Sequence, residues 1–324
     1  MILLMSEYTD NSTLYVSRWL LHWNIPFIRI DGAEKYILEQ VTLANGKRDI
    51  VLKNSQDQSK LIKMSEIRSV WYRRGEVNFV MPEISFVEYP MLQKAIEIYL
   101  EAENMTLEYY FYHLIADKPH IGTFFSRTVN KLHVLYEALN LGIKTPNTVV
   151  TTQAKLVQNL KPSNIISKAL YEGFKFNFQG GKYTNYTEQI DTDTLHANFF
   201  PTLFQENIEK EADIRVFYLC GKFYSMAIRS QSDEQTKTDF RKYIKGIGNR
   251  SFPFQLPLEL EGKLDRLMKK LGLETGSLDL IFTKKGEFIF LEVNPVGQFG
   301  MTSIPCNYML ERRIAHRLKE LANN

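Results

Sequence analysis

Two apolar segments that flank Lys285-Gly286 constrain the fold most strongly, because each carries an acidic residue within an otherwise hydrophobic run. Lys285-Gly286 predicts a β-hairpin with a two-residue turn, in which Lys284 pairs with Glu287. Counting back along the two strands places Asp279 directly opposite Glu292. Cross-strand Cβ atoms lie about 4.5–5.5 Å apart, so two carboxylates at these positions repel each other.

Asn294 follows Glu292 by two residues and therefore shares its face of the strand. Two carboxylates and an amide oxygen in one place favour a hard divalent cation, and Mg²⁺ fits such oxygen ligands best. The alternative is a solvated edge of the sheet where the acidic side chains never meet. A three-residue turn would shift the register and separate Asp279 from Glu292.

Length and charge exclude several classes of protein. The 324 residues, 44% of them hydrophobic, predict two or three domains, and 40 Lys+Arg against 37 Asp+Glu give a net charge of +3. The basic residues are scattered, so we expect no nucleic-acid partner. Cys220 and Cys306 are expected to be reduced thiols. Met1–Met5 predicts a buried strand rather than a signal peptide, and we expect a soluble, cytoplasmic protein without a membrane segment.

The order of predicted elements indicates an α/β protein. A helix over residues 13–23 should turn Leu14, Leu20 and Leu21 inward, and Asn45-Gly46 predicts a hairpin. Further helices are predicted over 90–114, after Asn130, over 257–271 and over 308–321, with strands dominating after residue 203. The predicted domains are an N-terminal α/β domain (1–117), a central subdomain (118–202) and a C-terminal subdomain (203–324).

The acidic hairpin resembles that of the ATP-grasp superfamily, whose ATP site is closed by a D…E-x-N strand pair, matched here by Asp279, Glu292 and Asn294. The other motifs occur in the superfamily's order: Asn130-Lys131, the G-I-x-x-P-x-T turn at 142–148, Lys168, the hinge at 204–208 and the D-I-R-V strand at 213–216. The resemblance implies an ATP-grasp fold with an N-terminal α/β (pre-ATP-grasp-like) domain, a central domain and a C-terminal antiparallel-sheet domain.

The chain more closely resembles the graspetide (microviridin-type) macrocyclases, particularly the grasp-with-spasm peptide maturases. The matching segments are Val70–Gly75, Ile228–Gln231, Asp239–Arg241 and Glu292–Phe299. Asp239-Phe240-Arg241 stands where related enzymes often have D-W-R, and the change keeps both charges.

The resemblance implies ATP and Mg²⁺ as cofactors, with the metal on Asp279, Glu292 and Asn294. The implied ATP-binding residues are Lys131, Lys168, Gln205, Glu206, Asn207, Ile208 and Glu211. Each lysine alone could equally be a solvated charge, and Glu209-Lys210-Glu211 is typical of a solvated loop. Gly180 and Gly181 could form a phosphate-binding flap or a plain turn.

Arginines are the candidates for carboxylate and phosphate contacts, because the planar guanidinium binds such groups through two hydrogen bonds. The candidate catalytic residues are Arg74, Arg215 and Arg241; the candidate substrate-binding residues are Arg74, Asp213, Arg215 and Arg229. Arg73 and Arg74 are adjacent on a predicted strand, so only one of them should enter a site. A surface salt bridge is the alternative for this pair.

The resemblance further implies the reaction and the partners. ATP would phosphorylate Glu or Asp side chains of a ribosomal precursor peptide with leader and core segments. Thr or Ser would then form ω-esters, or Lys ω-amides, and the enzyme would often be a homodimer. Two alternatives remain: an ATP-grasp ligase that acts on free amino acids or adds residues to a protein terminus, and an ATP-binding interaction protein without turnover.

Overall fold

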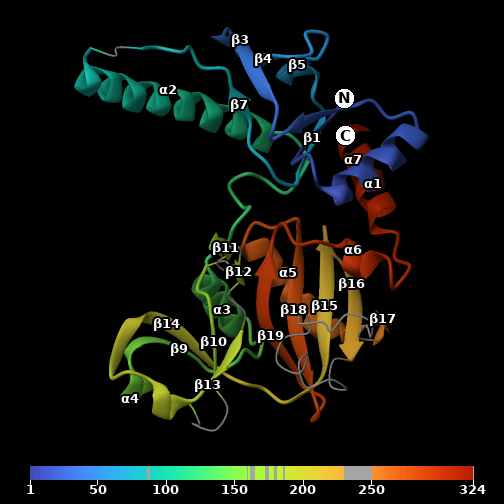
Figure 1. The fold of residues 1–324 in the computed structure, drawn as a ribbon. Coiled ribbons are helices and arrows are strands. Elements are labelled where there is room, and N and C mark those ends of the chain that lie inside the picture. The colour runs from blue at the N-terminus through green and yellow to red at the C-terminus, as the bar shows by residue number, and fades with distance from the viewer. Residues whose placement is uncertain are drawn as a thin grey trace. The chain divides into compact units, whose positions relative to one another are not determined.

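A computed structural model describes residues 1–85, 88–158, 160, 165–171, 175–178, 181–184, 187–229 and 250–323. The chain divides into two compact units (Figure 1). The first consists of Met1–Arg127 together with Met309–Asn324, and the second of Thr128–Tyr308. Each unit has its own β-sheets and its own hydrophobic core.

A parallel sheet with the strand order β2-β1-β6-β8 lies at the centre of the first unit. Its strands are β1 (Ile2–Ser6), β2 (Phe27–Asp31), β6 (Ser69–Tyr72) and β8 (His120–Ile121). Every residue of β1 is buried, which confirms the apolar start of the sequence as a core strand. Helices α1 (Asn11–His22) and α7 (Leu310–Asn323) pack side by side, and α7 also contacts β1, β6 and β8 (Figure 1).

The predicted inward face of α1 was partly wrong. Leu20 is buried, but Leu14 and Leu21 are 41% and 62% exposed, and the other buried residues of α1 are Thr13 and Val16. The helix therefore turns toward the sheet by the 13-16-20 row. The polar Thr13 can be buried here because its hydroxyl donates a hydrogen bond to Ser6 Oγ at 2.7 Å.

A second sheet in this unit has the order β5-β4-β3-β7. Its strands are β3 (Lys35–Ala44), β4 (Lys47–Asn54), β5 (Leu61–Lys63) and β7 (Asn78–Phe79), with a 3₁₀ turn at Met64–Glu66 after β5. Asn45 and Gly46 connect β3 to β4 with positive φ angles of 51° and 74°. Both central residues of a type I′ turn need a positive φ, so the predicted hairpin is confirmed.

The long helix α2 (Pro90–Ala116) confirms the predicted helix after Pro90. It joins the core only near its C-terminal end, where Tyr112 stacks on Phe124 with ring centroids 3.6 Å apart. Tyr112 also accepts the amide hydrogen of Val77 at its hydroxyl oxygen, at 2.9 Å. Among the described residues, no helix is both long enough and apolar enough to cross a membrane.

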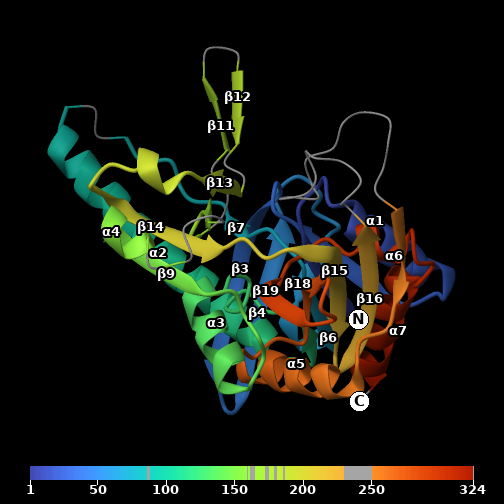
Figure 2. The same cartoon turned by 90° about the horizontal axis from the view of Figure 1, so that it is seen from below.

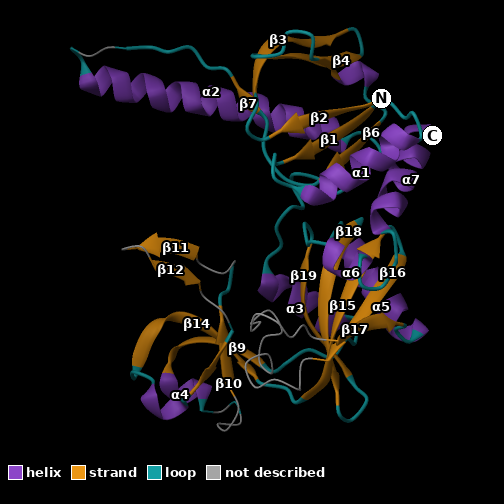
Figure 3. Cartoon of the chain, turned by 45° about the vertical axis from the view of Figure 1, so that its right-hand side comes forward, coloured by secondary structure: helices purple, strands orange, loops and turns teal. Residues whose placement is uncertain are grey.

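A five-stranded antiparallel sheet with the order β17-β16-β15-β18-β19 dominates the second unit (Figure 3). Its strands are β15 (Lys210–Leu219), β16 (Lys222–Arg229), β17 (Arg250–Phe254), β18 (Thr275–Thr283) and β19 (Phe288–Asn294). Helices α3 (Lys131–Asn140) and α5 (Leu258–Lys270) contribute to the core on one face of this sheet, and Figure 2 shows α5 lying along it. The short helix α6 (Gly300–Ser303) contacts β15 and β16.

A smaller sheet in the second unit has the order β13-β10-β14-β9. Its strands are β9 (Thr148–Gln153), β10 (Ile165–Lys168), β13 (Glu188–Ile190) and β14 (Asn198–Glu206), with α4 (Ala154–Val157) and a 3₁₀ turn at Thr192–Thr194. Strands β11 (Lys175–Phe178) and β12 (Gly181–Thr184) form a separate antiparallel hairpin (Figure 2). Gly181 pairs with Phe178 in that hairpin, whereas Gly180 lies outside the described residues.

The chain is therefore a mixed α/β protein, as predicted. Its C-terminal helix α7 belongs to the first unit, although the sequence groups residues 308–321 with the C-terminal subdomain. The three predicted domains, with boundaries at 117/118 and 202/203, remain a prediction.

Candidate functional site

Strands β15, β18 and β19 carry a row of charged side chains across one face of the large sheet. Arg215 is the register partner of Asp279, and Asp279 is the register partner of Glu292. Their neighbours Val216 and Leu278 belong to the core on the other face. Since successive side chains of a strand point to opposite faces, the charged row lies on the face opposite α3 and α5.

The predicted pairing of Asp279 with Glu292 is confirmed, but the predicted turn was wrong. Gly286 donates its amide hydrogen to Thr283 O, and Thr283 donates to Glu287 O, each at 2.9 Å, so three residues form the loop. This loop by itself would shift the register by one residue and separate the two carboxylates. Between the pairs Leu280–Phe290 and Asp279–Glu292, however, Leu291 is an extra residue, a β-bulge that restores the predicted pair.

The bulge also decides which side chains face the core. Phe290 and Val293 both belong to the buried cluster, although a regular strand would place residues three apart on opposite faces. The extra residue between them reverses the alternation, and Glu292 is thereby directed to the face that carries Asp279.

Arg215 and Asp279 form a close ion pair. Nη1 of Arg215 donates to both carboxylate oxygens of Asp279, at 2.6 Å and 2.5 Å. The two side chains are only 11% and 19% exposed, so water screens their attraction weakly. Arg215, predicted as a catalytic residue, thus lies directly against a predicted metal ligand.

Lys131 lies beside the second carboxylate. Its Nζ is 3.5 Å from Glu292 Oε2 and donates to the carbonyl oxygen of Ala169 at 3.1 Å. Asn130, the N-cap of α3, fixes this position because its side chain accepts the amide hydrogens of Leu132 and His133. Ala169 directly follows β10, which ends at Lys168, the second predicted phosphate lysine. The loop after Lys168 therefore contacts Lys131, the first predicted phosphate lysine.

Asn294 completes the predicted oxygen set. It follows Glu292 by two residues on β19, and its Oδ1 accepts the amide hydrogen of Val296 at 3.1 Å. Carboxylate and amide oxygens on one face are the donors that Mg²⁺ takes, so these residues fit that ion by their chemistry. Across the described ranges, no group of three or more His, Cys, Asp or Glu side chains is gathered for a metal, and this set has only two carboxylates.

Gly297 is a site residue that the sequence did not single out. Its amide donates to Asn294 O at 3.1 Å, which closes the turn after β19. A Cβ atom at Gly297 would lie 2.4 Å from both Cβ and Oγ of Ser277, the register partner of Asn294. Only glycine therefore allows this turn to pack against β18 beside the predicted metal ligands.

The predicted adenine hinge lies at the end of β14. Gln205 is completely buried, and its Nε2 donates to Thr148 Oγ1 at 2.8 Å, while its Oε1 accepts no hydrogen bond in the described part of the chain. Glu206 is half-buried, and its carboxylate accepts hydrogen bonds from the backbone and side-chain nitrogens of Asn147 at 3.3 Å and 2.9 Å. The two side chains leave the strand on opposite faces and do not converge on one point. Asn207 and Ile208 follow in the loop to β15 and are half-buried.

Lys210 does not lie in a solvated loop, which was the alternative for the run Glu209-Lys210-Glu211. It is buried, and its Nζ donates to Asp213 Oδ1 at 2.9 Å, with the two side chains 6% and 10% exposed. Lys210 pairs with Thr283 and Ala212 with Phe282, so Glu211 between them is the extra residue of a β-bulge. The bulge turns Lys210 to the face of Asp213, and no sequence signal marks it.

Glu211 and Arg229 lie apart from this ion pair, near the start of β15 and at the end of β16, where both are exposed. Arg229 Nη2 is 3.9 Å from Glu211 Oε1, with side chains 64% and 48% exposed. The Arg229 guanidinium lies over the Phe252 ring, 5.8 Å from its centroid. An ion pair this exposed contributes little to stability. The predicted roles of these residues in ribose and substrate binding remain predictions.

The predicted arginine pair of the first unit lies after β6, which ends at Tyr72, and not on a strand. The amides of Arg73 and Arg74 both donate to Met5 O, at 2.9 Å and 3.2 Å. Both Nε atoms approach Oδ2 of Asp10, at 3.1 Å and 3.9 Å, so the expectation that the pair diverges was wrong. Burial lowers the pKa of Arg73 to about 10.

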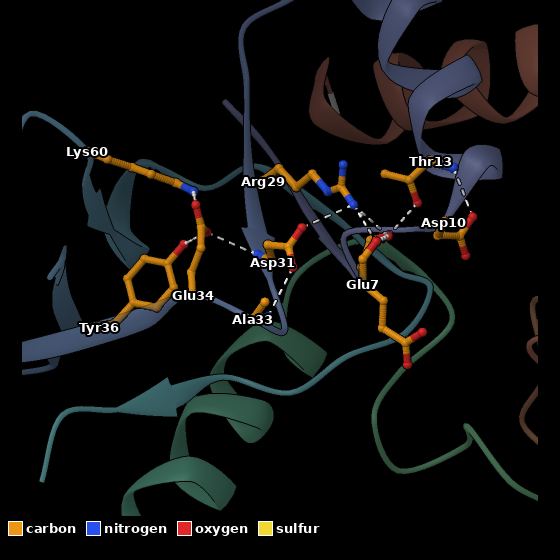
Figure 4. Close-up of polar contacts among 10 residues, drawn as sticks. Glu7, Asp10, Thr13, Arg29, Asp31, Ala33, Glu34, Tyr36 and Lys60 are labelled. Atoms are coloured by element: carbon orange, nitrogen blue, oxygen red, sulfur yellow. Dashed lines mark hydrogen bonds and ion pairs between the residues drawn. The ribbon is translucent and has the colours of Figure 1, made fainter. Parts of the chain in front are cut away.

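Asp10 belongs to a polar network at the carboxyl ends of β1 and β2 (Figure 4). It caps α1 by accepting the amide hydrogen of Thr13 at 3.2 Å. Nearby, Arg29 donates to the carbonyl oxygen of Glu7 and lies 3.3 Å from Asp31. Ligands of parallel α/β sheets bind outside the carboxyl ends of the strands, so this edge is a candidate that the sequence did not reveal. Arg241, the remaining predicted arginine, lies outside the described residues.

Comparison with known proteins identifies the fold. No family model matches the chain, and no curated protein matches it. Among solved structures, it is similar to a RiPP-associated ATP-grasp ligase of Chryseobacterium gregarium in complex with ADP and a leader and core peptide, with TM-score 0.80, 24% identity, and coverage of 99% of this chain and 96% of that one.

Two further solved structures are similar to this chain over nearly its whole length. The macrocyclase MdnC from Microcystis aeruginosa, bound with the precursor peptide MdnA, has TM-score 0.74 at 23% identity and covers 99% of this chain and 100% of its own. The ATP-grasp ligase PsnB, complexed with a minimal precursor, Mg and ADP, has TM-score 0.70 at 15% identity, with 100% and 98% covered. The chain therefore has the ATP-grasp fold in the form found in graspetide macrocyclases, as its sequence resemblance predicted.

Proposed function

We propose that this protein is an ATP- and Mg²⁺-dependent ligase that phosphorylates Glu or Asp side chains of a ribosomal precursor peptide. The activated carboxyl groups would then form ω-ester macrocycles with Thr or Ser, or ω-amides with Lys. The observation that carries the proposal is the row Arg215–Asp279–Glu292 with Lys131 beside it, a cluster of alternating charges on one face of an ATP-grasp sheet.

The bound molecules of the structural neighbours support the substrate class. The Chryseobacterium ligase holds ADP with a leader and a core peptide, MdnC holds a precursor peptide, and PsnB holds Mg and ADP with a minimal precursor. Each of these chains is matched over at least 96% of its length. A nucleotide and a peptide are therefore the ligands to test first. Both are made in the cytoplasm, which is the proposed location of this protein.

The chemistry requires activation, because a carboxylate expels oxide too poorly to react with a hydroxyl group. Transfer of the γ-phosphoryl group from ATP to a carboxylate oxygen gives an acyl phosphate and ADP. Attack of a Thr or Ser hydroxyl on the acyl carbon then forms the ester bond, breaks the bond to phosphate and releases one proton. Mg²⁺ held by Asp279, Glu292 and Asn294 would neutralise and orient the phosphates.

The residues of this chain would supply the remaining positive charge. Lys131 and Lys168 would approach the phosphate oxygens, and Arg215 would stabilise charge that develops during transfer. Arg215 pairs with Asp279 and Lys131 with Glu292, so both cations lie directly beside the proposed metal ligands. Arg215 and Lys131 would therefore be near enough to the proposed metal ligands to reach the phosphates as well.

Gln205 supports a nucleotide site at the hinge. A buried acceptor without a hydrogen-bond donor is costly, and a ligand amino group such as that of adenine would satisfy its Oε1. Glu206, Asn207, Ile208 and Glu211 would complete the nucleotide site. Arg74, Arg241, Asp213 and Arg229 are proposed to contact the peptide or its phosphorylated carboxyl group.

The experiment is to incubate the purified chain with ATP, Mg²⁺ and a precursor peptide rich in Thr and Glu, taken from a reading frame next to its own gene. Each crosslink removes one water from the peptide mass. Hydroxylamine traps the acyl phosphate as a hydroxamate, and mild hydroxide opens ester rings while sparing amides. Products that gain amino-acid masses would instead indicate a tailing ligase.

Two variants serve as controls. Asp279→Asn should abolish both ADP release and dehydration, whereas Lys285→Ala, an exposed change in the turn of the same hairpin, should leave both unchanged. If the wild-type chain releases no ADP with any peptide or amino acid, the ligase proposal is refuted.

A further inference from the structure

The side chain of Gln205 lies on the polar face of the small sheet. Phe204, its neighbour on β14, belongs to the buried cluster with Val157 and Ile165, and successive side chains of a strand point to opposite faces. Gln205 is therefore directed away from this cluster, and it is nevertheless completely buried. A buried amide needs hydrogen-bond partners at both of its ends.

Lys168 shares this face of the sheet with Gln205. Ile166 of β10 is the register partner of Gln205, and Lys168 follows Ile166 by two residues. Diagonal neighbours of this kind lie about 7–8 Å apart. A nucleotide whose phosphates approach Lys168 would therefore have its base near Gln205.

The nitrogen end of the Gln205 amide belongs to a chain of hydrogen bonds. Thr148, the register partner of Gln205 on β9, donates its hydroxyl hydrogen to Pro146 O at 2.9 Å. The Thr148 oxygen in turn accepts a hydrogen from Gln205 Nε2 at 2.8 Å. Oε1, the other end of the amide, accepts no hydrogen bond within the described ranges.

This chain of hydrogen bonds permits a single orientation of the amide. A hydroxyl group has one hydrogen to donate, and a carbonyl oxygen such as that of Pro146 can only accept. With its hydrogen donated to Pro146, Thr148 can offer Gln205 only an acceptor. An amide turned by 180° would bring Oε1 against Thr148 Oγ1, with no hydrogen between the two oxygens. Gln205 therefore directs an acceptor, and not a donor, away from Thr148.

Glu206, the other predicted base-reading side chain, is engaged elsewhere. It leaves β14 on the opposite face, and its carboxylate accepts hydrogen bonds from N and Nδ2 of Asn147 at 3.3 Å and 2.9 Å. Its own amide donates to Asn147 O at 3.1 Å. Of these two side chains, Gln205 is the one left to distinguish one base from another.

We propose that Thr148 is a positioning residue that makes the nucleotide site selective for purines with a 6-amino group against purines with a 6-oxo group. The inference rests on the proposed function, since it concerns the base of the nucleotide that the ligase would use. A 6-amino group donates to Oε1 of Gln205, whereas a 6-oxo group would place a second acceptor against it. Because water does not reach Gln205, the base must displace the atoms that cover Oε1, and no water then bridges two opposed acceptors.

The test compares the binding of ADP and inosine diphosphate in calorimetric titrations of the full chain with Mg²⁺. The two bases differ at the 6-position and in the hydrogen on N1, and inosine lacks the additional 2-amino group of guanine. The wild type should bind ADP at least about 100-fold more tightly, because a buried site built to hydrogen-bond an amino group rejects the analogue that lacks it.

Thr148→Val removes the hydroxyl group at nearly the same side-chain shape. Gln205 can then turn and donate a hydrogen of Nε2 to a 6-oxo group, so the ratio of the two dissociation constants should fall at least about 10-fold. The hydrogen on N1 contributes equally in both proteins, so the change in this ratio reports the 6-position.

Two matched variants control for the loss of a hydroxyl group. Thr148→Ser keeps the hydroxyl and should retain the wild-type ratio. Thr152→Val makes the same chemical change at an exposed position of β9 and should also leave the ratio unchanged. Circular dichroism should show folded protein for each variant, and Thr148→Ala removes the hydroxyl with less bulk if the valine variant does not fold.

A second background separates amide orientation from packing. Gln205→Glu has an acceptor at both ends of its side chain, so it offers an oxygen to the base in either orientation. In this background Thr148→Val should leave the ratio unchanged. A packing defect caused by the valine would instead change the ratio in both backgrounds.

Three results would overturn the inference while the proposed function stands. These are a wild type that binds ADP and inosine diphosphate with similar affinity, a folded Thr148→Val variant that keeps the wild-type ratio, and a ratio that falls equally in the Gln205→Glu background. A wild type that binds neither nucleotide would refute the proposed function itself, and this inference with it.

Discussion

Gly297 packs so closely against β18 that one added methyl group should disturb the candidate site. In Gly297→Ala, the new Cβ would lie 2.4 Å from Ser277 Cβ and Oγ and 3.0 Å from Asn294 O. Carbon atoms make contact at about 3.5–4.0 Å, so the turn or β18 must move by about 1 Å. Overpacking of this kind costs about 1–3 kcal/mol of unfolding free energy.

The displacement should impair turnover as well as stability. The turn holds Asn294 next to Glu292, and a shift of about 1 Å at a catalytic site can lower the rate about 100-fold. Urea unfolding would measure the free energy, and ADP release in the presence of Mg²⁺ and precursor peptide would measure the rate. The rate of ADP release should fall by more than the fraction of unfolded protein in the Gly297→Ala variant can account for.

Two control variants test the close contact between Gly297 and Ser277. Ser277→Gly removes the clashing Cβ, so the double variant Ser277→Gly/Gly297→Ala should recover part of both properties. Gly262→Ala changes a glycine of α5 whose Cβ would meet nothing within 4 Å, and helix propensity should stabilise that variant by about 0.5–1 kcal/mol. If Gly297→Ala behaves like Gly262→Ala, the close approach to Ser277 does not exist in solution.

Three further predictions concern the charged residues of the second unit. Glu292→Gln should abolish ADP formation without lowering the thermal midpoint, and retained turnover would refute its role in metal binding. Arg215→Lys keeps the charge beside Asp279 but loses the planar fork, so ADP release should fall more than stability; an equal loss in both would make Arg215 structural. Lys210→Met removes the ammonium group from its buried ion pair with Asp213 and should cost about 3–5 kcal/mol in urea unfolding, whereas Lys210→Met/Asp213→Leu should regain most of it. A single variant as stable as the wild type would contradict the buried pair.

The sequence by itself determined features that depend on a few neighbouring residues. Asn45-Gly46 adopts the positive φ angles of its hairpin turn, and Asn130 caps α3, because each is a local preference of the backbone. The order of motifs along the chain was enough to predict the ATP-grasp fold.

Only the tertiary structure decided where regular alternation fails. The pairing of Asp279 with Glu292 was predicted correctly, but from a two-residue turn that does not exist. The loop has three residues, and the bulge at Leu291 compensates for the register shift that this longer loop causes. The bulge at Glu211 buried Lys210, which looks solvated in the sequence. A bulge depends on how two distant strands pack together, and no local preference encodes it.

The same reason holds for the helices. The period of α1 showed that it is amphipathic, but contact with α7 and the parallel sheet decided that Thr13 rather than Leu14 faces inward. A helix over residues 90–114 was predicted from the sequence, and only the fold shows that its apolar residues Met91 and Ile98 are exposed. Local preferences fix the elements of a chain, whereas burial depends on partners that come from elsewhere in it.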